Sequence, residues 1–202
     1  MRQIRIIANM SLDGIIQAPG GPDEDKDGDF KHGGWAMPHF DATMGEAISA
    51  AQGETFDLLL GRRTYDIFAD FWPKVEGDAM ADGLNGATKY VATHRPDSLG
   101  WGPAEGLGED IGARVRSLKE RPGPDLIVWG SSTLTPLMFE WGLVDEALLL
   151  VFPVLLGGGK RFYSDQVPPR DLALVETRAA SSGVLINTYR PAGALPQSGA
   201  AS

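Results

Sequence analysis

FDLLLGRRTYDIFADFWP, residues 56–73, joins a compact apolar run to a helical pattern through a single glycine. The run 56–61 is typical of a strand that is buried on both faces of a parallel sheet. After the glycine, apolar residues recur from Tyr65 to Trp72 at the spacing of one helix face, and the pattern ends at a proline. This stretch therefore predicts a strand, a tight turn and a helix, which together form the repeating unit of an α/β fold.

Strands and helices alternate on both sides of this unit. We expect strands at 3–9, 56–61, 89–93, 125–129 and 146–154, helices at 42–52, 62–72, about 109–120 and 131–142, and a closing hairpin of 172–177 with 184–190. The alternation lasts until residue 141, and strands dominate after it. This order predicts an α/β fold with a mainly parallel sheet and antiparallel strands added at the end.

Length and local composition suggest the domain organisation. A chain of 202 residues can bury one core, and we expect a single domain over 1–191. Residues 19–34 are rich in Gly, Asp and Lys and too polar to pack, which predicts a long surface loop that is either a functional lid or disordered. The small and polar segment 192–202 predicts a flexible tail.

The overall charge and the residue types that are missing exclude several kinds of function. A formal net charge of −9 disfavours nucleic acids and anionic membranes as partners, but a phosphorylated ligand can still bind where Arg side chains gather. Without Cys there is no disulfide, thiolate zinc site or Cys nucleophile, and the three His residues lack metal-ligand spacing. No apolar run could span a bilayer and no signal peptide is recognisable, so we expect a cytoplasmic protein.

Polar residues that suit phosphate follow three of the predicted strands at their carboxyl ends, where ligands bind in open α/β sheets. The first set consists of Gly61, Arg62, Arg63 and Thr64. Gly61 permits a close approach of the backbone, while first-turn N–H groups and an Arg guanidinium can bind phosphate oxygens. The alternative is an ordinary strand-to-helix turn whose arginines are only solvated.

The other two sets follow the strands at 125–129 and 89–93. They consist of Gly130, Ser131 and Ser132, and of Thr93, His94 and Arg95. The small residues of the second set would admit a pyrophosphate, or a hydroxyl simply caps the next helix. The hydroxyl, imidazole and guanidinium of the third set suit a ribose 2′-phosphate, the group that separates NADP from NAD, although a polar loop explains them too. Three such strand ends favour a nucleotide site more than any one of them does.

Two motifs that suggest other nucleotide folds are incomplete. The run Gly157–Lys160 resembles a phosphate-binding loop but lacks the G-x-x-x-x-G-K-[ST] spacing. No G-x-G-x-x-G follows the first strand, so the Rossmann fingerprint is absent.

Three blocks of the sequence resemble the dihydrofolate reductase superfamily. They are IIANMSLDGII at 6–16, LLLGRRTYDIFADFWP at 58–73, and VWGSSTL with GLVDEALLLVFPVLLGGGKRFY within 128–163. The blocks are similar to bacterial dihydrofolate-reductase-family proteins and to the reductase domain of riboflavin biosynthesis, over roughly residues 2–190. The resemblance implies a three-layer α/β sandwich with a mainly parallel central sheet and a C-terminal antiparallel hairpin. It also implies an NADPH-dependent reductase.

The resemblance further implies which residues hold NADPH. Ala8 and Ile16 would flank the nicotinamide. Phosphates would meet Arg62, Arg63, Thr64, Gly130, Ser131, Ser132 and Leu134, and the 2′-phosphate would meet Thr93, His94 and Arg95. These positions coincide with the strand ends that the residue chemistry singles out.

The substrate side is less well defined. We expect Trp35, Met37 and Trp129 to contact a small pterin-, pyrimidine- or carbonyl-type substrate. Asp41 and Asp13 are the nearest acids that could deliver a proton. Each has a structural alternative, which is a helix N-cap for Asp41, where it is the favoured role, and a turn for Asp13.

Three hypotheses follow. The leading one is an NADPH-dependent oxidoreductase, the second is a non-catalytic NADP(H)-binding or ligand-sensing module, and the third is a scaffold whose helix N-termini are only capped. The apolar strands 146–154 and 184–190 also make a second copy of the chain a candidate partner, because riboflavin-type relatives pair through that region. An ordinary core explains the same residues.

Overall fold

The central sheet of the computed structural model, which describes residues 1–163, 167 and 169–195, has the strand order β4-β3-β2-β5-β1-β6-β8-β7. The strands are β1 Ile4–Ser11, β2 Phe56–Gly61, β3 Lys89–Ala92, β4 Ala104–Gly106, β5 Asp125–Trp129, β6 Glu146–Phe152, β7 Arg170–Ala179 and β8 Leu185–Ala194. The strands from β4 to β6 are parallel, while β8 runs antiparallel to both β6 and β7. This confirms the predicted mainly parallel sheet with a late antiparallel hairpin.

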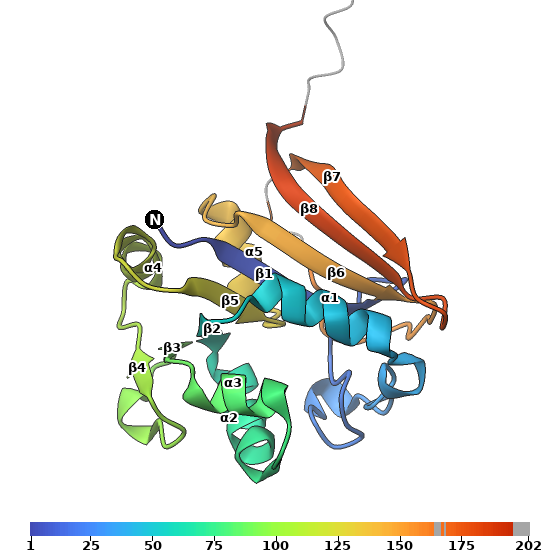
Figure 1. Cartoon of the computed structure of the whole chain (residues 1–202), viewed down its shortest axis with the longest axis horizontal. Helices are drawn as coiled ribbons and strands as arrows, with labels where there is room; N and C mark the ends of the chain where they lie inside the picture. Colours follow the sequence, from blue (N-terminus) through green and yellow to red (C-terminus); the bar gives the residue numbers. More distant parts are fainter. Residues whose placement is uncertain (164–166, 168, 196–202) are drawn as a thin grey trace, which may run out of the picture.

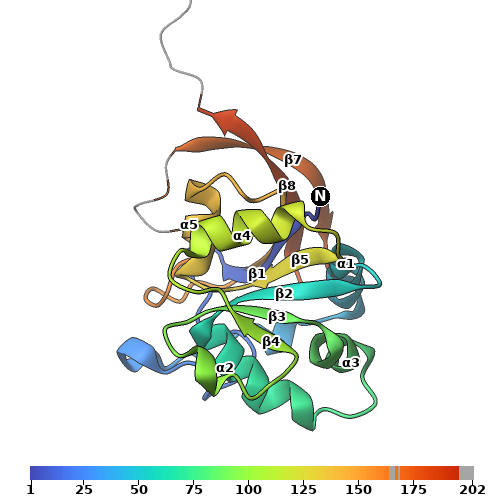
Figure 2. The same ribbon diagram turned by 90° about the vertical axis from the view of Figure 1, so that its left-hand side faces the viewer.

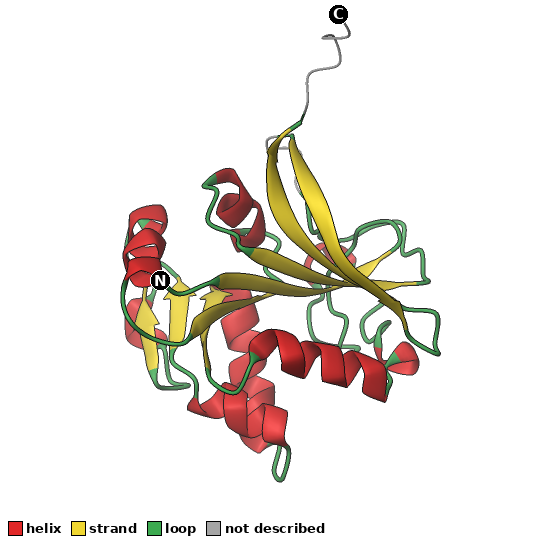
Figure 3. Cartoon of the chain, turned by 45° about the horizontal axis from the view of Figure 1, so that its top comes forward, coloured by secondary structure: helices red, strands yellow, loops and turns green. Residues whose placement is uncertain are grey.

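Helices cover both faces of this sheet, which makes the fold a three-layer sandwich (Figures 2 and 3). They are α1 Ala42–Gln52, α2 Arg62–Phe71, α3 Ala79–Gly86, α4 Ile111–Glu120 and α5 Leu134–Glu140. Buried residues of α1, α2 and α3 belong to one apolar cluster, and those of α4 and α5 belong to the other. The dihydrofolate-reductase-like architecture that the resemblance implies is therefore confirmed.

The apolar run of β2 explains why the sheet lies between two helix layers. Leu58, Leu59 and Leu60 have no exposed surface, and successive side chains of a strand point to opposite faces. Leu58 and Leu60 accordingly pack in the cluster under α1, α2 and α3, while Leu59 packs under α4 and α5. A strand with apolar residues at every position is stable only where both of its faces are covered.

Several boundaries differ from those predicted. The short elements α3 and β4 were not expected, and the last helix begins at Leu134 because residues 131–133 form a turn. The hairpin is longer than predicted, and residues 192–194 of the predicted tail belong to β8, where Gly193 pairs with Asp171. Backbone pairing with β7 holds this segment although its side chains are small. The rest of the predicted tail, 196–202, lies outside the described residues.

The β7–β8 hairpin extends away from the helices (Figure 1). Most of β7 is exposed, including the apolar side chains of Leu174 and Val175. Among the helices that the structure describes, none has the length and apolar character that crossing a membrane requires.

Candidate functional site

The strand order brings the three predicted phosphate-binding strand ends together. β2 pairs in parallel with β3 on one side and with β5 on the other. Because parallel strands end at the same edge of a sheet, Gly61, Thr93 and Gly130 follow neighbouring strands at one edge. Residues that are up to 69 positions apart in the chain thus meet there.

Gly61 lies directly against the turn that follows β5. Gly61 directly precedes the first residue of α2 and has an extended backbone. Because Gly61 has no side chain, Ser131 can lie directly against its Cα atom. A Cβ atom at position 61 would collide with Ser131 Oγ and come within 3.8 Å of Thr133 Oγ1. The glycine is therefore required by this close approach, and its backbone φ of −70° is open to any residue.

The turn after β5 has an uncommon backbone. Gly130 and Ser131 have φ angles of +53° and +63°, and a positive φ is uncommon for a serine. Ser131 Oγ accepts the backbone N–H of Leu134 at 3.1 Å, so the hydroxyl does cap the following helix. A non-glycine residue with positive φ, such as Ser131, often occurs at ligand sites, whereas Gly130 adopts this conformation without strain.

Arg62 connects the first strand end to the third. Its Nη1 donates to Ser98 Oγ at 2.8 Å, to the Arg95 carbonyl at 3.1 Å and to Thr93 Oγ1 at 3.3 Å. Its Nε donates to Asp66 at 2.8 Å. Arg62 is therefore ordered against the 93–98 turn.

The remaining residues of these strand ends differ in exposure. His94 and Arg95 are exposed, while Thr64 and Ser132 are half-buried and Leu134 is buried. The side chain of Arg95 lies 4.0 Å from Asp66, so both Arg62 and Arg95 face the same carboxylate.

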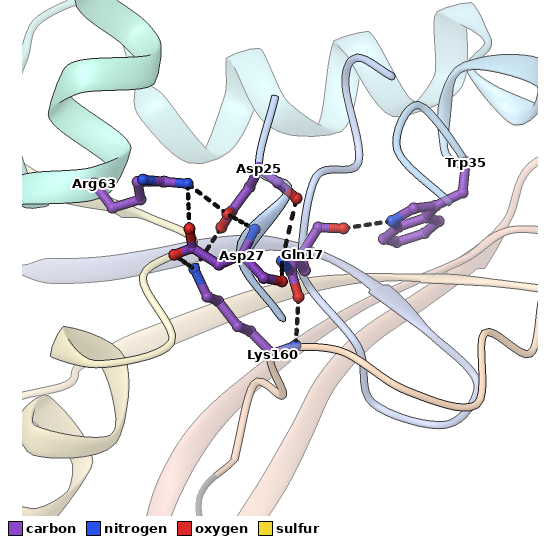
Figure 4. Close-up of polar contacts among 6 residues, drawn as sticks. All are labelled: Gln17, Asp25, Asp27, Trp35, Arg63 and Lys160. Atoms are coloured by element: carbon purple, nitrogen blue, oxygen red, sulfur yellow. Dashed lines mark hydrogen bonds and ion pairs between the residues drawn. The ribbon is translucent and has the colours of Figure 1, made fainter. Parts of the chain in front are cut away.

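Arg63, although next to Arg62, points to a different part of the molecule. Its Nη2 donates to both Asp25 and Asp27 at 2.8 Å (Figure 4). Lys160 Nζ donates to the same two carboxylates, at 2.6 Å and 2.7 Å. We call Asp25, Asp27, Arg63 and Lys160 the charge cluster. It places the 19–34 loop against the N-terminus of α2.

The side chain of Gln17 holds the 19–34 loop in place by binding backbone carbonyls of the loop. The buried Gln17 amide donates to the carbonyls of Asp25 at 3.1 Å and Asp27 at 2.9 Å, and its Oε1 accepts the N–H of Lys160. The Gln17 carbonyl accepts the indole N–H of Trp35 at 2.7 Å (Figure 4). The loop, called the strap below, is therefore an ordered segment and not a disordered one.

Burial and charge act in opposite directions on Asp25. Burial alone would raise the pKa of Asp25, but the hydrogen bonds from Lys160 and Arg63 outweigh it and leave that pKa below its ordinary value. The same pairing raises the pKa of Arg63. Both shifts favour the charged forms of Asp25 and Arg63. With two carboxylates and two cationic side chains, the formal charges of the cluster sum to zero.

The predicted substrate residues divide by exposure. Trp35 and Trp129 are buried in the cluster under α1 and α2, with Trp35 edge-on to Phe152 at 5.2 Å, whereas Met37 is 55% exposed. The indole N–H of Trp129 is buried and has no hydrogen-bond partner among the described residues, and the same holds for Asn9 Oδ1. Ala8 and Ile16 are buried together in the other cluster.

Asp41 caps a helix and binds a distant turn. Its carboxylate accepts the N–H of Met44 at 3.2 Å at the start of α1, together with the hydroxyl and N–H of Ser181 at 2.9 Å and 3.2 Å. The Ser181 hydroxyl is the largest cause of the lowered pKa of Asp41. A carboxylate held in this way acts as an acceptor, which is the structural alternative weighed for it above.

Asp13 likewise has structural contacts. It accepts the Ser11 hydroxyl at 2.6 Å and the N–H of Gly157 at 2.7 Å, which ties the turn after β1 to the segment after β6. The Ser11 hydrogen bond is the main cause that lowers the pKa of Asp13 to about 2.

Three functional candidates escaped the sequence reasoning. Gln17, Asp25 and Lys160 belong to no local motif, and the only signal was the incomplete phosphate loop that ends at Lys160. Their contacts span more than a hundred positions of the chain, which no spacing rule covers. Within the described residues no group of three His, Asp or Glu side chains is arranged to hold a metal ion.

Comparison with known proteins identifies the class. The RibD C-terminal domain matches residues 108–186. A putative riboflavin biosynthesis protein from Shewanella sp. PV-4 superposes with a TM-score of 0.61 at 17% identity, covering 94% of this chain and 98% of that one. A dihydrofolate reductase from Enterococcus faecalis, complexed with NADP(H) and RAB-propyl, superposes with a TM-score of 0.59 at 13% identity, covering 94% of this chain and 96% of that one. A pyrimidine reductase-like protein from Corynebacterium diphtheriae superposes with a TM-score of 0.60 at 13% identity, covering 94% of this chain and 92% of that one. These likenesses define the fold as that of the dihydrofolate-reductase-like superfamily.

A full-length relative narrows this class. The uncharacterized protein YyaP of Bacillus subtilis (strain 168) is 31% identical over 195 residues, which covers 94% of this chain and 96% of that protein. The chain therefore belongs to the family of YyaP.

Proposed function

We propose that this protein is an NADPH-dependent reductase whose cofactor lies across the carboxyl ends of β3, β2 and β5. The observation that carries this proposal is the meeting of three phosphate-compatible turns at one sheet edge, with Arg62 bonded to the 93–98 turn. A pyrophosphate would lie against the turn of Gly130 and Ser131, because a Cβ on Gly130 would meet no atom within 4 Å, whereas the space beside Gly61 is filled by Ser131 Oγ.

Each turn would hold a different part of the cofactor. Arg62, Arg63 and Thr64, with Gly130, Ser131, Ser132 and Leu134, would bind the phosphates of the dinucleotide. Thr93, His94 and Arg95 would bind the 2′-phosphate, and the exposed guanidinium of Arg95, which lies 4.0 Å from Asp66, would turn to it. Ala8 and Ile16 would flank the nicotinamide. The bound cofactor would supply the hydride, and the protein would supply its position.

The substrate we propose is a small pterin-, pyrimidine- or carbonyl-type molecule near Trp35, Met37 and Trp129. Pterins and pyrimidines carry ring N–H and C=O groups side by side. The unpartnered donor of Trp129 and the unpartnered acceptor of Asn9 match that pattern. A water molecule is the proposed proton source, because the lowered pKa values of Asp41 and Asp13 leave both carboxyls without a proton to donate at neutral pH.

Parallel titrations with NADPH and NADH test the cofactor assignment. We expect NADPH to bind at least about tenfold more tightly, since only NADPH carries the 2′-phosphate that Arg95 would pair with. Substituting Arg95→Ala should abolish that preference. Equal affinity for both cofactors in the wild type would contradict the assignment.

A second candidate function is a non-catalytic NADP(H)-binding or ligand-sensing module. The observation that favours it is that Asp41 and Asp13, the two nearest acids, are both held as hydrogen-bond acceptors. It predicts NADPH binding without oxidation of the cofactor. Incubation with NADPH and a panel of pterins, pyrimidines and aldehydes separates the two functions, because only a reductase consumes the reduced cofactor.

We also propose that two copies of the chain pair through the late strands. Leu174, Val175 and Leu185 are 52%, 49% and 44% exposed on the β7–β8 hairpin, and pairing with a second copy would bury these apolar side chains. Light scattering should give twice the chain mass for the wild type. A Leu174→Glu variant should give the mass of one chain.

A further inference from the structure

Arg62 and Arg63 are adjacent in the chain, yet their guanidinium groups meet different kinds of partner. Arg62 bonds mainly to neutral oxygens on Thr93, Arg95 and Ser98, besides one carboxylate of Asp66. Arg63 bonds to two carboxylates, both from the strap (Figure 4). At the N-terminus of α2, where an anion would bind, two protein carboxylates already occupy one of the two arginines.

Asp25 is fixed more firmly than Arg63 is. The side chain of Asp25 is 7% exposed, whereas the side chains of Arg63 and Asp27 are each 52% exposed. Gln17 also holds the backbone carbonyls of both acids. Since an exposed arginine rotates readily and a buried carboxylate does not, Arg63 can turn away while Asp25 stays in place.

Lys160 keeps Asp25 and Asp27 paired with a cation when the Arg63 side chain turns away. Its Nζ lies within 2.7 Å of a carboxylate oxygen on each acid, and these are the oxygens that Arg63 does not use. If Arg63 turns toward another anion, Asp25 and Asp27 therefore keep one cation. The cost of breaking the contact is that of two partly exposed ion pairs, not that of a bare buried charge.

We propose that Asp25 and Asp27 are affinity-determining residues, internal anions that compete with the phosphates of the bound dinucleotide for Arg63. This inference rests on the proposed function in one respect, which is that it places those phosphates at the N-terminus of α2. Without ligand, the strap carboxylates neutralise Arg63. With ligand, Arg63 turns to a phosphate oxygen, and the carboxylates remain with Lys160.

The competition limits the affinity of the protein for the cofactor. Binding must first separate Arg63 from two carboxylates. Removing their charge should therefore tighten binding. Acids that merely supported the site would have the opposite effect when changed, so the sign of the effect decides between the two roles.

The test compares the wild type with the near-isosteric double variant Asp25→Asn/Asp27→Asn by calorimetric titration. The two probes are NADPH and inorganic pyrophosphate. We expect Kd to fall about tenfold for both, since each partly exposed ion pair contributes up to about 1 kcal/mol. Asp23→Asn is the control, because Asp23 lies in the same strap and, among the described residues, forms an ion pair only with the exposed Lys26. It removes one equal charge and should change Kd by less than about twofold.

A second pair of variants tests whether the effect acts through Arg63. In an Arg63→Gln background, the two Asp→Asn changes should no longer tighten binding, because no guanidinium is left to compete for. An undiminished effect there would overturn the proposal in favour of general charge repulsion. If the double variant fails to fold, by circular dichroism, the single variant Asp27→Asn serves, since that side chain is 52% exposed.

The outcomes separate this inference from the proposed function. An unchanged or increased Kd for both probes in the double variant overturns the competition, whatever the wild type binds. Tighter pyrophosphate binding with no NADPH binding by either protein supports the competition and contradicts the NADPH assignment. Tighter binding of both probes supports both.

Discussion

The edge of the sheet at β3, β2 and β5 and the neighbouring edge at β1 and β6 are organised in different ways. At the first edge, the proposed phosphate-binding residues directly follow each strand, and Arg62 links two of the turns. At the second, the strap, α2 and the segment after β6 meet through Asp25, Asp27, Arg63 and Lys160. The first edge depends on local turn chemistry, and the second on side chains that only the fold brings together.

The difference indicates how the two edges can change. The β3–β2–β5 edge presents backbone N–H groups and small residues, which suit a phosphate of any ligand. The β1–β6 edge presents bulky and charged side chains that can be exchanged singly. We infer that the phosphates of the cofactor bind at the first edge and that control of affinity belongs to the second.

The largest expected effect concerns Arg62. An Arg62→Ala variant should bind NADPH about a hundredfold more weakly, because the phosphate loses a charged donor that is worth about 1.5–3 kcal/mol. Isothermal titration measures it. Arg114→Ala, which breaks an ion pair with Glu105 elsewhere on the surface, is the matched control and should leave Kd unchanged. Equal losses in both variants would remove Arg62 from the site.

Gly61→Ala tests how closely the first edge is packed. The added methyl group would collide with Ser131 Oγ, and we expect the free energy of unfolding to fall by about 1–3 kcal/mol. Urea unfolding measures it. Gly45→Ala is the control, since a Cβ there meets no atom within 4 Å and α1 should gain up to about 1 kcal/mol. A neutral Gly61→Ala would show that the close approach is not needed.

Asp41 separates a capping role from a catalytic one. Asp41→Ala should lower the free energy of unfolding by about 1 kcal/mol through loss of the helix cap, whereas Asp41→Asn should retain it. Because Asn cannot deliver a carboxyl proton, kcat should also be unchanged in Asp41→Asn if water is the proton source. A steep fall of kcat in Asp41→Asn with normal stability would make Asp41 the proton donor.

Asp13 has the smallest expected effect on stability, and this effect disappears in acid. The pKa of Asp13 is about 2 in the folded protein, below the ordinary value of 3.8, so its contribution to stability is present above pH 3.8. That contribution is lost as the pH falls toward 2, and it amounts to at most about 1 kcal/mol once solvent screening is considered. Unfolding curves of wild type and Asp13→Asn should therefore converge as the pH falls, and parallel curves would contradict the assignment.

Much of the fold was predictable because its signals are local. The buried run at 58–60 and the helical spacing after Gly61 indicate the strand and helix without any distant contact. The elements that were missed, α3 and β4, carry weak signals, since one contains two glycines and the other has three residues. The end of β8 was missed because backbone pairing with β7, not residue type, holds it.

The candidate site likewise has a part that was predictable from the sequence and a part that was not. The residues of the three strand ends were predictable, because small, hydroxyl-bearing and Arg residues directly after a strand commonly bind phosphate. The partners of Arg63 were not predictable, because Asp25 and Lys160 lie 38 and 97 positions away in the sequence. Nor could the sequence tell that Ser181 would hold Asp41, since that contact spans 140 positions.

The sequence by itself determined the order of strands and helices, the chemistry at their junctions and the absence of thiol chemistry, because each of these depends on residues that are neighbours in the chain. Only the tertiary structure decided which of two adjacent arginines faces the 93–98 turn and which is neutralised by the strap. The physical reason is that an ion pair forms wherever folding places opposite charges within reach, and chain spacing carries no record of that placement.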